Sequence, residues 1–155
     1  MATVDVSTSI VIERPRNQVA AYAANPDNAP AWYERIEAVE WKTHLAFGLG
    51  AQVAFVARFL GRRLTYTYEI IDLVPGSRLV MRTSEGPFPM ETTYTWESTA
   101  QGGTHMTLRN RGIPTGFSRV VAPFLTFAMR RANAQDLSRL KQLLERHEDT
   151  EPVGT

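Results

Sequence analysis

The C-terminal part of the chain constrains the fold most, because it predicts one helix with two unlike halves. Residues 130–146 have an amphipathic pattern with a leucine stripe. Residues 120–129 are apolar on nearly every helical face. A helix from about Gly116 to Arg146 therefore meets two kinds of surroundings. This asymmetry favours a long helix that closes over something apolar.

The residues before this helix alternate between apolar and polar side chains in short runs, as half-buried strands do. Between the first run and the second, prolines punctuate two short helical segments, around Val19–Ala23 and Ala31–Tyr33. Glycine-containing turns such as Gly61-Arg62 and Pro75-Gly76 separate later runs. The predicted strands are Val4–Ile12, Ile36–Thr43, Ala51–Phe59, Arg63–Asp72, and the runs around Leu79–Met81, Met90–Glu97 and Met106–Arg111.

Successive strands with short turns form an antiparallel meander, and its apolar face needs a cover. Only the last helix is long enough, since roughly 30 helical residues span about 45 Å. We expect an α+β helix-grip arrangement, in which a curved antiparallel sheet of about seven strands wraps around the long C-terminal helix. Two short helices lie between the first two strands. One domain is expected over residues 1–146, followed by a disordered tail at 147–155.

Composition excludes several classes of function. Seventeen Lys and Arg against sixteen Asp and Glu leave a net charge of +1, so we expect no nucleic-acid partner. The absence of cysteine excludes disulfides and thiolate chemistry. The N-terminal residues lack the pattern of a signal peptide, and no apolar run approaches the length of a membrane span. We therefore expect a cytoplasmic protein without stable membrane insertion.

Several segments resemble the SRPBCC superfamily, which includes START lipid-transfer domains, birch-pollen-type allergens and polyketide cyclase/dehydrase-like proteins. The resembling segments are Ile10–Pro15, Val19–Tyr22, Asn25–Trp32 and the last helix from Arg131 to Glu145. The resemblance covers about residues 3–146. It implies a helix-grip fold with an internal cavity, which the family uses for sterols, lipids, quinones, aromatic polyketides and other hydrophobic ligands. Some members are enzymes and many only bind.

Strand parity places aromatic and hydroxyl-bearing side chains on the face that the helix covers. Such hydroxyls need partners when they are buried, so they suit a ligand pocket, although aromatic core packing would also explain them. The first turns of the helix would supply the opposite wall. The predicted ligand-binding residues are Phe55, Tyr66, Tyr68, Met90, Thr92, Tyr94, Trp96, Met106, Asn110, Phe117, Val121 and Phe124.

No catalytic residue can be assigned from the sequence. The histidines His44, His105 and His147 are scattered, so we expect no metal site and no cofactor. By parity, no His, Asp, Glu or Lys points inward, and the arginines at 58, 63, 78, 82, 109 and 111 point outward. Tyrosines remain as possible hydrogen-bond donors, with an ordinary pKa near 10.

The sequence and the resemblance together predict binding or transport of a small hydrophobic molecule in an internal cavity. One alternative is an enzyme of the polyketide cyclase or aromatase type, in which Tyr or Asn side chains polarise carbonyl groups. Another is an interaction module that uses the apolar stretch Val120–Met129, in a homodimer or with another protein. The same stretch could also touch a membrane during exchange of a lipid.

Overall fold

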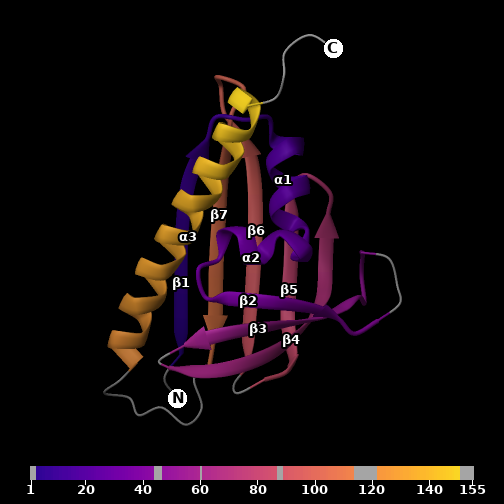
Figure 1. Ribbon diagram of the computed structural model, residues 1–155, viewed down its shortest axis with the longest axis vertical. Helices are drawn as coiled ribbons and strands as arrows, with labels where there is room; N and C mark the ends of the chain where they lie inside the picture. The colour runs from indigo at the N-terminus through magenta and orange to yellow at the C-terminus, as the bar shows by residue number, and fades with distance from the viewer. Residues whose placement is uncertain (1–2, 44–46, 60, 87–88, 114–121, 151–155) are drawn as a thin grey trace.

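The computed structural model describes residues 3–43, 47–59, 61–86, 89–113 and 122–150, and it has the predicted order of elements (Figure 1). One strand is followed by two helices with a short 3-10 turn, Pro26–Asn28, between them; then come six strands and a long helix. The elements are β1 (Val4–Ile12), α1 (Arg16–Ala24), α2 (Ala29–Trp32), β2 (Ile36–Trp41), β3 (Gln52–Phe59), β4 (Arg62–Val74), β5 (Arg78–Glu85), β6 (Met90–Ser98), β7 (Thr104–Gly112) and α3 (Ala122–Thr150).

The seven strands form one antiparallel sheet in the order β1-β7-β6-β5-β4-β3-β2. The N-terminal strand therefore pairs with the last strand, while β2 to β7 follow one another as a meander. In Figure 1, β2, β3 and β4 turn across the direction of β5 to β7, so the sheet is strongly curved. The helices α1, α2 and α3 lie on the same side of it. The helix-grip prediction is confirmed.

Helix α3 begins at Ala122 in the described structure, and residues 116–121 of the predicted helix lie outside the described residues. Pro123 lies in the first turn, where a backbone N–H has no partner within the helix. The helix passes the predicted end at Arg146 and continues to Thr150, and residues 151–155 of the predicted tail lie outside the described residues. None of the described helices is long and apolar enough to span a membrane.

Two separate clusters of buried side chains hold α3 to the sheet. The larger cluster contains Leu137, Leu140 and Leu144 together with side chains from β1, β3 to β7, α1 and α2. The smaller one contains Leu125, with Val4 and Val6 of β1 and the half-buried Met129 beside them. The second half of α3 (residues 137–150) therefore packs on a filled core, whereas the first half (122–136) rests mainly on the start of β1.

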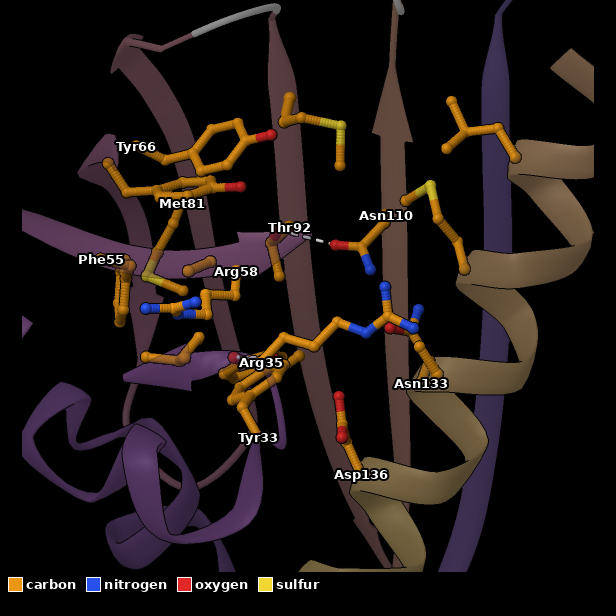
Figure 2. A pocket seen from close by; sticks show the side chains of 18 residues that line it. Tyr33, Arg35, Phe55, Arg58, Tyr66, Met81, Thr92, Asn110, Asn133 and Asp136 are labelled. Carbon is orange, nitrogen blue, oxygen red and sulfur yellow. Dashed lines mark hydrogen bonds between the residues drawn. The ribbon is translucent and has the colours of Figure 1, made fainter. Parts of the chain in front are cut away.

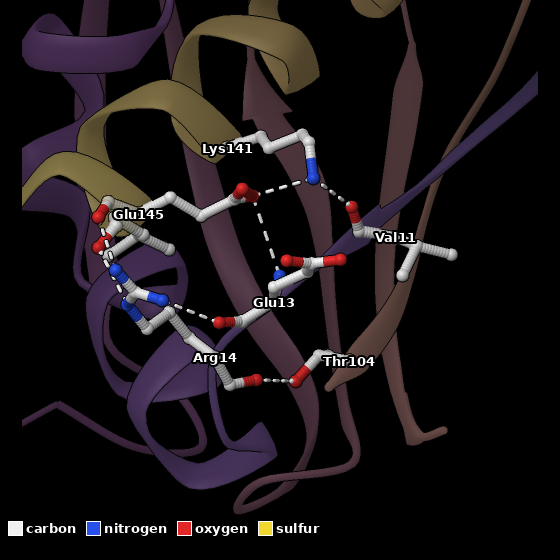
Figure 3. Close-up of polar contacts among 7 residues, drawn as sticks. Val11, Glu13, Arg14, Thr104, Lys141 and Glu145 are labelled. Atoms are coloured by element: carbon white, nitrogen blue, oxygen red, sulfur yellow. Dashed lines mark hydrogen bonds and ion pairs between the residues drawn. The ribbon is translucent and has the colours of Figure 1, made fainter. Parts of the chain in front are cut away.

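Polar contacts fix the second half of α3 to the end of β1 (Figure 3). The Arg14 side chain donates from Nε to the Leu144 carbonyl oxygen at 3.2 Å, and from Nη2 to the Glu145 carbonyl oxygen. Lys141 Nζ donates to the Val11 carbonyl oxygen at 2.8 Å and lies 2.6 Å from Glu145 Oε2. We call these contacts the Arg14 latch. The hydrogen bonds of Arg14 and Lys141 to carbonyl oxygens join residues far apart in the chain and oppose separation of the helix from the strand.

Candidate functional site: a cavity under the first half of α3

A cavity of about 200 Å³ lies between the concave face of the sheet and the first half of α3 (Figure 2). The sheet supplies its aromatic wall, the segment after α2 supplies one side, and α3 supplies the other. The lining residues are Tyr33, Arg35, Ile36, Phe55, Ala57, Arg58, Tyr66, Tyr68, Met81, Met90, Thr92, Tyr94, Asn110, Leu125, Met129, Ala132, Asn133 and Asp136.

The sheet wall is built from rings on neighbouring strands. Phe55 of β3 pairs in register with Tyr66 of β4, and the rings of Phe55 and Tyr68 meet edge to face with centroids 5.6 Å apart. Tyr66 and Tyr68 stand on the same face, with ring centroids 6.3 Å apart. Gly86 gives the Tyr66 ring its room, because a Cβ there would lie 2.9 Å from Tyr66 Cδ1. The result is a broad apolar surface suited to a flat molecule.

The tyrosine hydroxyls in the cavity are neutral hydrogen-bonding groups. Tyr33 and Tyr94 share a hydrogen bond between their hydroxyl oxygens. Burial raises the pKa of Tyr68 to about 12 and raises the pKa values of Tyr33 and Tyr94 well above their ordinary value. All three hydroxyls therefore stay neutral near pH 7, and none can act there as an ionised base.

A buried side-chain pair joins β6 and β7 beside these rings. Thr92 Oγ1 donates to Asn110 Oδ1 at 2.8 Å, and both residues are buried. Because its oxygen is engaged by Thr92, the Asn110 amide is oriented with its nitrogen directed elsewhere (Figure 2). This pair fixes a polar point in the middle of an otherwise apolar sheet surface.

Helix α3 brings a carboxyl group into the cavity wall. Asp136 is 6% exposed, and its Oδ1 accepts the backbone N–H of Glu34 at 3.1 Å. Burial raises the pKa of Asp136 to about 6; the hydrogen bond from Glu34 and the charges of Arg35 and Arg139 act in the opposite direction. The carboxyl group is therefore poised to change its charge within about one pH unit of neutrality.

Asn133 lies one helical turn before Asp136 and is also buried. Among the described residues, its Nδ2 has no hydrogen-bond partner. A buried donor without a partner costs free energy, on the order of 1–3 kcal/mol, which an acceptor on a ligand would recover. Asn133 Nδ2 is therefore the atom of the cavity wall to which a ligand oxygen would most clearly bind.

Two arginines reach this cavity from the other side. In Figure 2 the Arg35 side chain extends across the cavity toward Asn133, which puts a guanidinium group near the α3 wall. Arg58 lies at the rim, where its Nε donates to Glu37 Oε1. A register shift between Ile36 and Ala38 marks a bulge in β2 at this point. The cavity therefore has one aromatic wall and one wall rich in hydrogen-bonding and charged groups.

Seven of the twelve predicted ligand-binding residues line this cavity, and they come from β3, β4, β6 and β7. Their placement shows that parity identified the inner face of the sheet; whether they bind a ligand is a prediction. The seven are Phe55, Tyr66, Tyr68, Met90, Thr92, Tyr94 and Asn110.

The other predicted residues do not line it. Phe124 is 72% exposed, so its prediction as a cavity residue was wrong; Leu125 and Met129 of α3 face the cavity instead. Trp96 and Met106 share the inner face, but they are buried in the filled core under the second half of α3. Phe117 and Val121 lie outside the described residues.

The prediction that no acid points inward was also wrong. Asp136 was overlooked because strand parity says nothing about the helix. Spacing along α3 could have found it, since Leu125, Met129, Asn133, Asp136 and Leu140 follow one another at steps of three or four residues. Two polar residues within a buried stripe are a signal of a site. Among the described residues, no cluster of acidic or histidine side chains could hold a metal ion.

Comparison with known proteins identifies the class to which this fold and cavity belong. Residues 3–145 match the family model described as polyketide cyclase / dehydrase and lipid transport, so the chain belongs to this family. The family lies within the START/SRPBCC superfamily, and the resemblance predicted from sequence is confirmed. No curated protein matches the chain in sequence.

Solved structures with little sequence identity share the fold. The Zhui aromatase/cyclase from Streptomyces sp. R1128 has a TM-score of 0.78 at 18% identity, over 94% of this chain and 95% of that chain. A START superfamily protein from Mycobacterium smegmatis has a TM-score of 0.76 at 12% identity, over 90% of this chain and 98% of that chain. A protein from Thermus thermophilus has a TM-score of 0.76 at 19% identity, over 89% of this chain and 94% of that chain.

Proposed function

We propose that this protein binds one small, largely apolar and flat molecule that carries an oxygen at one end. The observation that carries the proposal is the division of the cavity into two walls. Rings of Phe55, Tyr66 and Tyr68 form one wall, and the unpartnered amide nitrogen of Asn133 lies in the other. A ligand would stack on the rings and direct its oxygen to Asn133 and the nearby Arg35.

The volume of the cavity limits the size of this ligand. Pockets for drug-sized molecules usually enclose roughly 300–1,000 Å³, and this cavity measures about 200 Å³. It suits a molecule of one or two rings better than a long acyl chain or a sterol. A larger ligand would have to extend past the rim at Arg58 or displace the first half of α3.

The proposal is tested by ligand binding and by filling the cavity. Mass spectrometry of an organic extract of the purified protein reveals any molecule carried from the cell, and 2-naphthol serves as a fluorescent probe with two rings and an oxygen at one end. Ala57→Phe places a ring inside the cavity, and we expect it to abolish probe binding without lowering the melting temperature. Ala38→Phe, at an exposed position of β2, is the matched control.

The result that contradicts the proposal is equally definite. If no extracted molecule is found and the probe binds the Ala57→Phe variant as well as the unchanged protein, the cavity is not the binding site. Asn133→Leu adds a second arm, because it removes the amide while keeping similar volume. It should weaken the binding of probes that carry an oxygen and leave the binding of purely aromatic probes such as naphthalene unchanged.

A second candidate function is catalysis of the aromatase/cyclase type, and one observation favours it. Asp136, with its raised pKa, lies in the same cavity as neutral tyrosine hydroxyls and Arg35, so a proton acceptor and hydrogen-bond donors surround one space. Such groups could remove a proton next to a carbonyl and stabilise the resulting enolate. Zhui and the di-domain ARO/CYC proteins BexL and StfQ share the fold.

Matched substitutions separate the enzyme from the carrier. Asp136→Asn retains an acceptor for the Glu34 N–H but removes the base, and Tyr94→Phe removes one donor. If the protein cyclises poly-β-keto thioesters, we expect both variants to lose product formation while they retain probe binding. Unchanged product formation in Asp136→Asn would exclude Asp136 as the base.

A further inference from the structure

The outer side of the first half of α3 carries two exposed aromatic side chains. Phe124 is 72% exposed and Phe127 is 64% exposed, and they lie three residues apart on the helix. Leu125 and Met129, on the same turns, line the cavity. The apolar start of α3 therefore has an inner side that lines the cavity and an outer side that is exposed to water.

The charged side chains on this part of α3 have one sign. Arg130 and Arg131 are exposed and follow Phe127 within about one helical turn. Arg131 is seven residues after Phe124, so the two share a face of the helix. Among the described residues 122–135 there is no acidic side chain, and the next one, Asp136, is turned into the cavity wall.

We propose that Phe124, Phe127, Arg130 and Arg131 form a docking surface for an anionic phospholipid membrane. Aromatic side chains insert at the boundary between headgroups and acyl chains, and arginines beside them bind lipid phosphates and carboxylates. Two rings and two cations give reversible attachment to the surface. Because Leu125 and Met129 lie on the opposite side of the same turns, docking brings the cavity close to the lipid.

A second copy of this chain is a poorer occupant. In a symmetric dimer through this surface, each copy would face a patch that carries the same two arginines and, on residues 122–135, no acidic side chain to complement them. Like charges that face each other across an apolar contact oppose association, whereas an anionic lipid surface complements them. The charges therefore favour lipid over self-association.

Vesicle flotation tests the proposal directly. We expect the protein to float with vesicles of equal parts phosphatidylcholine and phosphatidylserine, to float less with phosphatidylcholine alone, and to detach as the salt concentration rises. Arg130→Gln and Arg131→Gln should each reduce the partition coefficient by about fivefold. The double variant Phe124→Ser/Phe127→Ser should reduce it further. These side chains are exposed, so we expect melting temperatures and uptake of the cavity probe to stay unchanged.

Matched controls use exposed residues elsewhere. Leu49→Ser removes an apolar side chain that is 66% exposed, and Arg82→Gln removes an exposed arginine of β5. Both should leave flotation unchanged. The proposal is overturned if the unchanged protein does not bind the anionic vesicles, or if the two control variants lose binding as much as the α3 variants. It is also overturned if light scattering shows a dimer that Phe124→Ser/Phe127→Ser dissociates, since the surface would then bind a second copy.

Discussion

The two halves of α3 belong to one continuous helix but are held in different ways. Leu137 and Leu140 of the second half are fully buried in the large core, and the Arg14 latch ties the following turns to β1. The first half has Leu125 in a small cluster, a cavity on its inner side and exposed rings on its outer side. The filled core and the candidate site are thus separated along one element, since a cavity can exist only where the core is incomplete.

The largest expected change in the free energy of unfolding appears when a leucine is replaced by alanine in each half. Leu140→Ala should lower the free energy of unfolding by about 3–4 kcal/mol, because it opens a void in a filled core. Leu125→Ala should cost only about 1–2 kcal/mol, because its neighbourhood already borders a cavity. Chemical denaturation of both variants measures the difference. Equal losses would show that the two halves are held equally firmly.

The latch predicts a smaller effect that is confined to the second half. Arg14→Met keeps the length of the side chain but removes its hydrogen bonds to the Leu144 and Glu145 carbonyl oxygens. We expect a loss of about 1–2 kcal/mol and faster amide hydrogen exchange in residues 137–146. Gln142→Met, at an exposed position of the same helix outside the latch, should change neither quantity. Exchange that accelerates equally in the first half would contradict a local latch.

Asp136 predicts a still smaller effect of opposite sign. The folded-state pKa of Asp136, about 6, lies above the ordinary 3.8, so the folded protein binds this proton more tightly than the unfolded chain. The stabilising contribution is therefore complete below about pH 4 and is lost as pH rises toward 6 and above. The raised pKa, about 6 against 3.8, corresponds to about 3 kcal/mol at pH 7. Asp136→Asn should raise the free energy of unfolding at pH 7 by only about 1 kcal/mol, because its new amide N–H groups must themselves be buried.

The pH profile is the sharper measurement for this variant. Between about pH 4 and 6 the unchanged protein should lose stability from this group, and Asp136→Asn should remove that slope. Thermal unfolding across this range checks it. An unchanged slope in the variant would mean that another group titrates there.

The period of two in the sequence was sufficient to predict the seven strands and their inner face. It could not show where along that face the core is filled. Trp96 and Tyr94 have the same parity on β6, yet Tyr94 lines the cavity and Trp96 does not. That difference depends on the curvature of the sheet and on where α1 and the second half of α3 cover it. These are contacts between distant segments, which local alternation does not encode.

The helix was harder to orient for a physical reason. In residues 120–129 nearly every face is apolar, so the hydrophobic pattern has no phase, and Phe124 and Leu125 are equally plausible inner residues. Phe124 was predicted to face inward and is exposed. Extending the phase back from Leu137 and Leu140 would have selected Leu125 and Met129. It would also have placed Asn133 and Asp136 inside.

The place of β1 at the edge of the sheet, beside β7, has a consequence for the order in which the protein assembles. β1 leaves the ribosome first, but its described strand partner is residues 104–112, and the helix that packs on it comes later still. In the meander from β2 to β7, each strand can pair with the preceding one as it emerges. The apolar side chains of β1 stay unpaired until β7 has formed. Bringing these two distant strands together closes a long loop, and we expect this step to govern the folding rate.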